Sequence, residues 1–253
     1  MSGHSKWKTI KRKKAITDGK RGKLFTKLIR EITMAARTGG GSPDSNPRLR
    51  VAVDKAREES MPSDNIKRAI ARATGEGADA VHYEEAVYEG YGPGGTAIMI
   101  EALTDNKNRT SSELRAQIAR TGGNLGEPGC VAWNFQPAGV ITFARARHEE
   151  EALMAAALEA GAEDFRVGES SYDVITAPTE LDKVRSALKA KGLEPASAEL
   201  ARLPKTTVTL EGHAAEQMMK LLEVLEDHDD VQHVYANYDI SDKVMEQLVA
   251  SAA

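Results

Sequence analysis

The spacing of apolar residues changes near residue 84, and this change constrains the fold more than any other feature of the sequence. Before that point, apolar residues recur at the three- and four-residue intervals of amphipathic helices, with breaks near Gly39, Pro62 and Gly75. After it, short apolar runs of strand length alternate with helical segments. The pattern therefore predicts a small bundle of three helices followed by mixed helix and sheet.

Strand–helix–strand units of similar length follow one another from residue 139 onward. The first two give the order βαββαβ, which is typical of a ferredoxin-like sandwich. The third would join an earlier hairpin at 84–103 and a helix at 110–121, and a short strand is expected at 131–135. We therefore predict an α+β protein, with an N-terminal three-helix domain followed by two small α/β domains of ferredoxin-like type, the middle one discontinuous. The predicted division is a basic helical domain at 1–78, a discontinuous domain at 79–138 plus 204–240, an inserted βαββαβ domain at 139–203 and a C-terminal tail at 241–253.

Charge is distributed very unevenly along the chain. Residues 1–30 contain 11 Lys and Arg against one acidic residue, Asp18, which gives a net charge of +10. Residues 81–253 contain 15 basic and 29 acidic residues, a net charge of -14. Such a split predicts a basic N-terminal segment that binds a polyanion and an acidic body that does not.

Cations between residues 20 and 37 recur at helical intervals and share one helical face. This stripe of Lys20, Lys23, Lys27, Arg30 and Arg37 could follow several phosphates, and we expect its charged ends to lie in water. A solvated surface is the alternative. The candidate nucleic-acid-binding residues are Lys6, Trp7, Lys8, Lys11, Arg12, Lys13, Lys14, Lys20, Arg21, Lys23, Lys27, Arg30, Arg48 and Arg50.

Three of these candidates have a second interpretation. Trp7 could stack on an unpaired base or anchor the basic segment in a core. Arg48 and Arg50 flank a helix start, which favours phosphate, but they could instead form ion pairs with Glu58, Glu59 or another domain.

Two polar segments each have two interpretations, as a ligand site or as part of the local structure. Residues 105–110 precede a helix, where they could hold an anion, although the chemistry of an Asx turn is the favoured interpretation. Asp227, Asp229 and Asp230 could hold a cation, but an acidic helix end is the favoured account.

Signatures of enzymes and membrane proteins are missing from the sequence. The glycine-rich segments at 92–95 and 122–126 lack the context of a phosphate loop, the histidines lack zinc spacing, and Cys130 is the only cysteine. No apolar run approaches the roughly 18 residues that span a bilayer. We expect a cytoplasmic protein that is not an enzyme, with no cofactor, metal, small-molecule substrate or membrane partner.

Seven segments of the sequence form motifs that can be compared with known families: 3–7, 21–28, 46–50, 61–66, 88–95, 103–110 and 122–126. Together they resemble the YebC family of transcriptional regulators, which includes a mitochondrial translational activator. The resemblance implies a helical N-terminal domain, two α/β domains and nucleic-acid binding in the regulation of gene expression, without catalysis.

The sequence favours RNA or the ribosome over DNA as the target. A row of lysines supplies affinity for phosphate rather than base readout, and no helix-turn-helix pattern is visible. We therefore predict a role in translation. A DNA-binding transcriptional regulator is the alternative, and a nucleotide-dependent enzyme is a remote one, because distant carboxylates can assemble in a fold.

Overall fold

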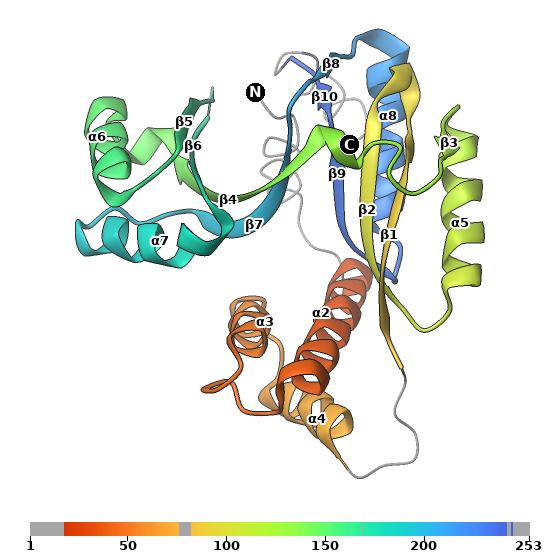
Figure 1. The fold of residues 1–253 in the computed structure, drawn as a ribbon, viewed down its shortest axis with the longest axis horizontal. Coiled ribbons are helices and arrows are strands. Elements are labelled where there is room, and N and C mark those ends of the chain that lie inside the picture. Colours follow the sequence, from red (N-terminus) through yellow and green to blue (C-terminus); the bar gives the residue numbers. More distant parts are fainter. Residues whose placement is uncertain (1–17, 76–81, 169, 242–243, 245–253) are drawn as a thin grey trace.

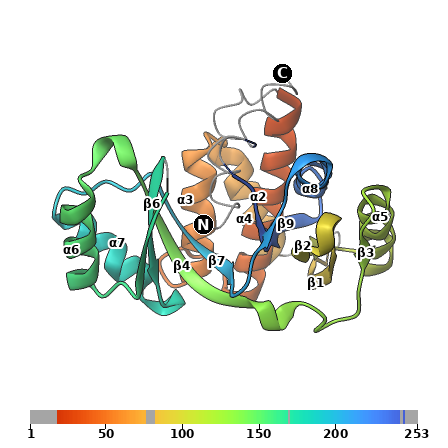
Figure 2. The same cartoon turned by 90° about the horizontal axis from the view of Figure 1, so that it is seen from above.

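The computed structural model describes residues 18–75, 82–168, 170–241 and 244, with side chains from residue 21 onward. The chain forms a group of helices, a middle sheet backed by helices, and an inserted sheet with its own helices (Figure 1). Seen from above, α5 of the middle part and α6 of the inserted part lie at opposite ends of the molecule (Figure 2). The predicted α+β fold class is confirmed, whereas the predicted tail lies almost entirely outside the described residues.

In the described part of the N-terminal domain, three helices pack together, as their apolar spacing predicts. Asn46 begins the second of them by accepting a hydrogen bond from the backbone N–H of Leu49 at 3.1 Å, and Pro47 follows in the first turn. Leu28, Ile32, Leu49, Val53 and Ile66 are buried in one shared cluster. The helices are α2 (Asp18–Gly39), α3 (Pro47–Glu58) and α4 (Ser63–Thr74).

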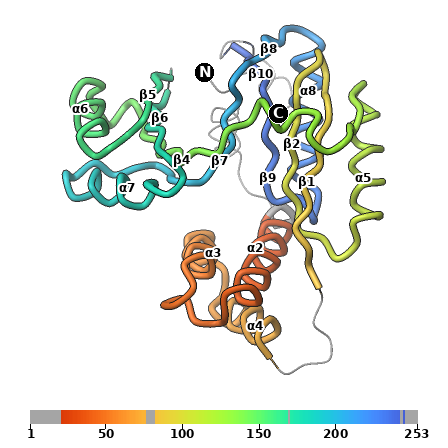
Figure 3. Tube along the Cα trace, in the orientation of Figure 1, coloured from red at the N-terminus to blue at the C-terminus, as the bar shows by residue number. Residues whose placement is uncertain are grey.

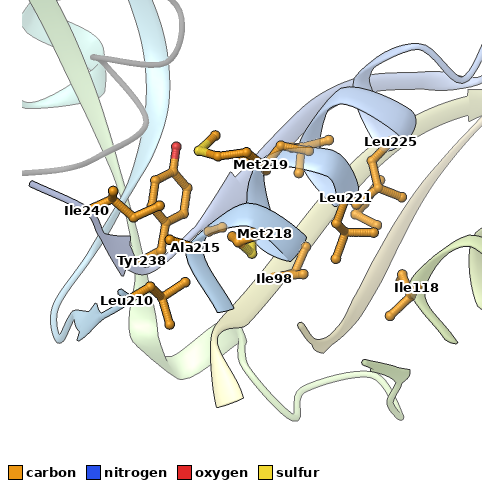
Figure 4. Close-up of a cluster of buried hydrophobic side chains, with 14 of the residues drawn as sticks. Ile98, Ile118, Leu210, Ala215, Met218, Met219, Leu221, Leu225, Tyr238 and Ile240 are labelled. Carbon is orange, nitrogen blue, oxygen red and sulfur yellow. The ribbon is translucent and has the colours of Figure 1, made fainter. Parts of the chain in front are cut away.

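The middle sheet is antiparallel and has the strand order β3-β1-β2-β9. Its strands are β1 (Glu84–Tyr91), β2 (Ala97–Thr104), β3 (Asn124–Leu125) and β9 (Val231–Ala236), while β8 (Val208–Thr209) pairs in parallel with β10 (Tyr238–Asp239). Helices α5 (Lys107–Arg120) and α8 (Gly212–Glu226) pack on one face, where Ile98, Ile118, Met218 and Leu221 are buried (Figure 4). Because β9 follows the inserted strands, the middle domain is discontinuous, as predicted.

The inserted sheet has the antiparallel order β5-β6-β4-β7, which is the ferredoxin-like order that its βαββαβ sequence predicts. The middle sheet has a different strand order on the same two-layer plan. The chain enters the inserted part along β4 and returns along β7, which lie side by side (Figure 3). The elements are β4 (Phe135–Ala144), α6 (Glu150–Ala160), β5 (Asp164–Val167), β6 (Ser171–Thr176), α7 (Leu181–Ala190) and β7 (Ser197–Pro204).

The strand expected at 131–135 is wrong. A 3-10 turn, Ala132–Asn134, occupies this segment, and β4 begins only at Phe135. The buried Glu89 carboxylate explains the difference, because it accepts backbone N–H groups from Gly129, Val131 and Ala132 at 2.7–2.9 Å. Burial alone would raise the pKa of Glu89, but these three donors outweigh it and leave that pKa lowered. These N–H groups are therefore already hydrogen-bonded to Glu89 and are not available for pairing with a neighbouring strand.

The inserted sheet should fold without the rest of the chain. Its core, which includes Ile141, Phe143, Leu153, Val174 and Leu188, draws every member from this part alone. We expect a fragment of residues 135–204, which keeps β4 and β7 whole, to unfold cooperatively on heating in a circular dichroism experiment. A fragment without a cooperative transition would contradict the predicted division of the chain into domains.

Candidate nucleic-acid interface

The structure places only part of the predicted interface. Lys6, Trp7, Lys8, Lys11, Arg12, Lys13 and Lys14 lie outside the described residues, and so does the side chain of Lys20. The described candidates are Arg21, Lys23, Lys27 and Arg30 on α2, with Arg48 and Arg50 on α3. Arg21 is exposed, and the other five each contact another part of the chain.

Three cations of the α2 stripe, Lys23, Lys27 and Arg30, face the middle domain. Lys23 Nζ lies 3.8 Å from the carboxylate of Asp227, and Lys27 donates to the backbone carbonyl of Glu226. Both partners lie at the C-terminal end of α8, where unpaired carbonyls carry partial negative charge and favour cations. The expectation that the charged ends of this stripe lie in water is therefore corrected for Lys27 and Arg30, which are partly buried against the body, whereas Lys23 is 48% exposed and Arg37 is exposed.

Arg30 departs most from that expectation, with a side chain only 13% exposed. Its guanidinium pairs with the carboxylate of Asp230, donates to the carbonyl of Leu103 at 3.1 Å, and lies 5.2 Å from the ring centre of Tyr83. One α2 side chain thus contacts the end of β2 and the residues that precede β1 and β9.

Asp230 is the centre of this contact and is 3% exposed. Besides Arg30, its carboxylate accepts hydrogen bonds from Arg109 Nη2 at 2.9 Å and from the hydroxyls of Thr104 and Thr110. Burial would raise the pKa of Asp230, but the hydrogen bond from Thr110 and the two guanidiniums outweigh it and hold that pKa well below its usual range. Asp230 is therefore a buried anion held by two domains.

The segment 105–110 combines both roles considered from its sequence. Asn106 caps α5 by accepting the backbone N–H of Arg109 at 3.1 Å, which is the expected Asx geometry. Arg109 and Thr110 also hold an anion, and that anion is Asp230 of the same chain. An acidic end to α8 is confirmed, and Asp230 itself accepts guanidinium and hydroxyl donors.

The turn that carries Asp230 is held in place by His228. The backbone N–H of Asp230 donates to His228 Nδ1 at 3.1 Å, and the other ring nitrogen lies 2.8 Å from the carboxylate of Glu113 on α5. With Nδ1 accepting, Nε2 carries a proton and donates it in a hydrogen bond to Glu113.

Arg48 and Arg50 are engaged within the chain. Arg48 pairs with Glu31 at 2.8 Å and with Glu85 of β1 at 2.7 Å, so the alternative of an ion pair with another domain is confirmed, with a different partner from Glu58 or Glu59. Arg50 donates to the carbonyls of Pro43 and Asp44. A role of either residue in nucleic-acid binding stays a prediction.

Sequence reasoning missed other exposed cations. Lys67 and Arg72 on α4 are exposed, as are Arg115 and Arg120 on α5. None of these four forms an ion pair with another described residue. Their signal in the sequence was weak, because none of them belongs to the strongly basic segment 1–30.

The described part of the chain has neither a cluster of metal-ligand residues nor a helix that could cross a membrane. No group of three or more His, Cys, Asp or Glu there could hold a metal ion. None of the helices within these ranges is long and apolar enough to cross a membrane.

Known proteins are similar to this chain over nearly its whole length. Residues 5–76 match the family model "TACO1/YebC protein N-terminal domain", and residues 83–238 match "TACO1/YebC second and third domain". A "Probable transcriptional regulatory protein" from Pelotomaculum thermopropionicum is 57% identical over 96% of this chain and 100% of its own length. One of the same description from Syntrophus aciditrophicus is 56% identical over 99% of this chain and 100% of its own.

A solved structure has the same fold. The crystal structure of a conserved hypothetical protein, Aq1575 from Aquifex aeolicus, superposes with a TM-score of 0.81 at 44% sequence identity. The match covers 90% of this chain and 94% of that one. Since both family models match in order and the relatives are similar from end to end, this chain belongs to the TACO1/YebC family.

Proposed function

We propose that the protein is a regulator of gene expression that binds nucleic acid through its basic N-terminal segment, with RNA preferred and translation as the process regulated. The observation that carries the proposal is the charge of this segment. Residues 6–14 contain six Lys and Arg and no acidic residue, whereas the body from residue 81 onward is strongly acidic. Nucleic-acid phosphates attract the first region and repel the second.

The contacts of α2 indicate which cations would meet phosphate first. Since Lys23, Lys27 and Arg30 engage the end of α8, the first encounter with phosphate falls to residues 6–14 and to exposed cations such as Arg21, Lys67 and Arg72. These side chains supply affinity without reading base edges.

A DNA-binding transcriptional regulator is the second candidate, and the names of the relatives favour it. A competition-binding experiment distinguishes the RNA function from the DNA function. RNA should displace a bound fluorescent RNA at lower concentration than duplex DNA of the same length does, and the reverse order would favour the DNA function.

Binding should weaken steeply as salt is added. Each phosphate that a cation neutralises releases counterions, so about six contacts with a duplex give a log–log slope of affinity against salt near -5. Fluorescence anisotropy at several salt concentrations measures this slope. A variant lacking residues 1–17 is the control and should show a much shallower slope. A slope near zero for the full chain would refute binding through the basic segment.

A further inference from the structure

The N-terminal helices meet the body through charge rather than through a shared hydrophobic core. In the described part of the chain, the cluster around Leu28 and Ile32 contains only residues of the helical domain, and the cluster around Ile98 and Met218 contains only residues of the middle domain. No cluster joins the two. Polar contacts of this kind are weakened by ions in a way that a buried apolar interface is not.

The polar contacts between the helical domain and the body share one arrangement of charge. In those of the described residues, the helical domain supplies the cation and the body supplies the acceptor. They include Lys23 with Asp227, Lys27 with the carbonyl of Glu226, Arg30 with Asp230, and Arg48 with Glu85. Three of the four cations lie along one face of α2. That spacing is also what would let the face follow a phosphate backbone.

We propose that the acidic end of α8, residues 226–230, and nucleic-acid phosphate compete for this face of α2, so that binding releases the helical domain from the body. The carboxylates and carbonyl at this end take the place of phosphate oxygens while the protein is free. This inference rests on the proposed function.

The contacts differ in strength, and this difference determines the order in which they would break on release. The Lys23–Asp227 pair is exposed, 48% and 32% respectively, and phosphate can replace it readily. The Arg30–Asp230 pair is buried and opens last, because its charges must find new partners together. Since binding and docking exclude one another, any change that weakens docking should strengthen binding, and the reverse.

Energy transfer between two dyes would follow the release directly. Dyes are attached to Ala71→Cys on α4 and Ala119→Cys on α5, both exposed positions, in a chain with Cys130→Ser. The probe is a single-stranded RNA of 30 nucleotides, and its anisotropy reports binding in the same sample. We expect transfer efficiency to change in proportion to bound RNA, and to change also when salt alone is raised. Saturated binding with constant transfer would overturn the inference and leave the proposed function standing, whereas absence of binding to RNA and to DNA would overturn both.

Paired variants test the competition independently. Asp227→Asn with Asp230→Asn removes two negative charges from the end of α8, and Glu159→Gln with Glu180→Gln removes two from the inserted domain, where they pair with Lys191 and Lys183. The first pair should bind the RNA about fivefold more tightly than the parent chain, because docking no longer competes. The second should change affinity by less than about twofold, since those charges lie outside the shared face. Equal changes in both would contradict competition. If the first pair does not fold, judged by circular dichroism, the energy-transfer experiment on the chain with intact contacts decides.

Discussion

Replacing Asp230 by alanine is expected to lower the free energy of unfolding by about 3–5 kcal/mol, because it leaves two guanidiniums without their shared carboxylate. Asp230 is 3% exposed, and Arg30 beside it is 13% exposed, so water cannot easily replace the lost partner. Thr104 and Thr110 each lose a hydrogen bond to this carboxylate as well. Urea denaturation at pH 7, followed by circular dichroism, measures the loss.

The neighbouring aspartate provides a matched control. Asp229 is exposed, so Asp229→Ala removes the same charge one residue away and should alter the unfolding free energy by less than about 0.5 kcal/mol. Equal losses in the two variants would show that general charge, and not the buried contact, governs stability.

The loss on replacing Asp230 should also depend on pH. The pKa of Asp230 is lowered in the folded protein, so its carboxylate stabilises the fold at every pH above the unfolded value of about 3.9. That contribution is lost as pH falls below about 4, toward the folded pKa. The difference between the parent chain and Asp230→Ala should therefore be largest near neutral pH and shrink in acid. A difference that stays constant would point to lost packing instead of lost charge.

Much of the architecture follows from local sequence. The βαββαβ order of the inserted sheet could be predicted because each strand and helix there carries its own apolar period and its own stop, such as Gly161 at the end of α6. The turn at 132–134 could not, because the side chain that holds it, Glu89, lies more than 40 residues earlier. The apolar spacing and the strand propensity of a short segment do not reveal an acceptor that lies so far away in the sequence.

The candidate interface also depends on contacts between distant residues, which the sequence alone does not reveal. Helical spacing correctly placed Lys23, Lys27 and Arg30 on one face, but it does not state what covers that face. Their partners lie about 200 positions away, in an acidic segment that looked like an ordinary helix end. A stripe of cations and a cluster of acids are each easy to see in a sequence, and only the fold shows that they neutralise each other.

This pairing changes which substitutions test the proposed function. Reversing Arg30 to Glu would set a carboxylate against Asp230 in a buried site, so lost binding could reflect lost structure. Lys11, Arg12, Lys13 and Lys14 belong to the basic segment and lie outside the described residues. Changing these four to Glu shifts the local charge by eight units and replaces an attractive field with a repulsive one.

We expect this reversal to weaken RNA binding at least about 100-fold near physiological salt, because the lost cations no longer release counterions. The control is reversal of Lys183, Arg185, Lys189 and Lys191, four exposed cations of the inserted domain, which changes the net charge equally. Their ion pairs are exposed and add little stability, and affinity should fall less than about threefold. Anisotropy measures binding, and circular dichroism verifies the fold of both variants. If folded forms of both bind like the parent chain, or lose affinity equally, binding does not reside in the basic segment, and the contact with nucleic acid must be sought elsewhere on the molecule.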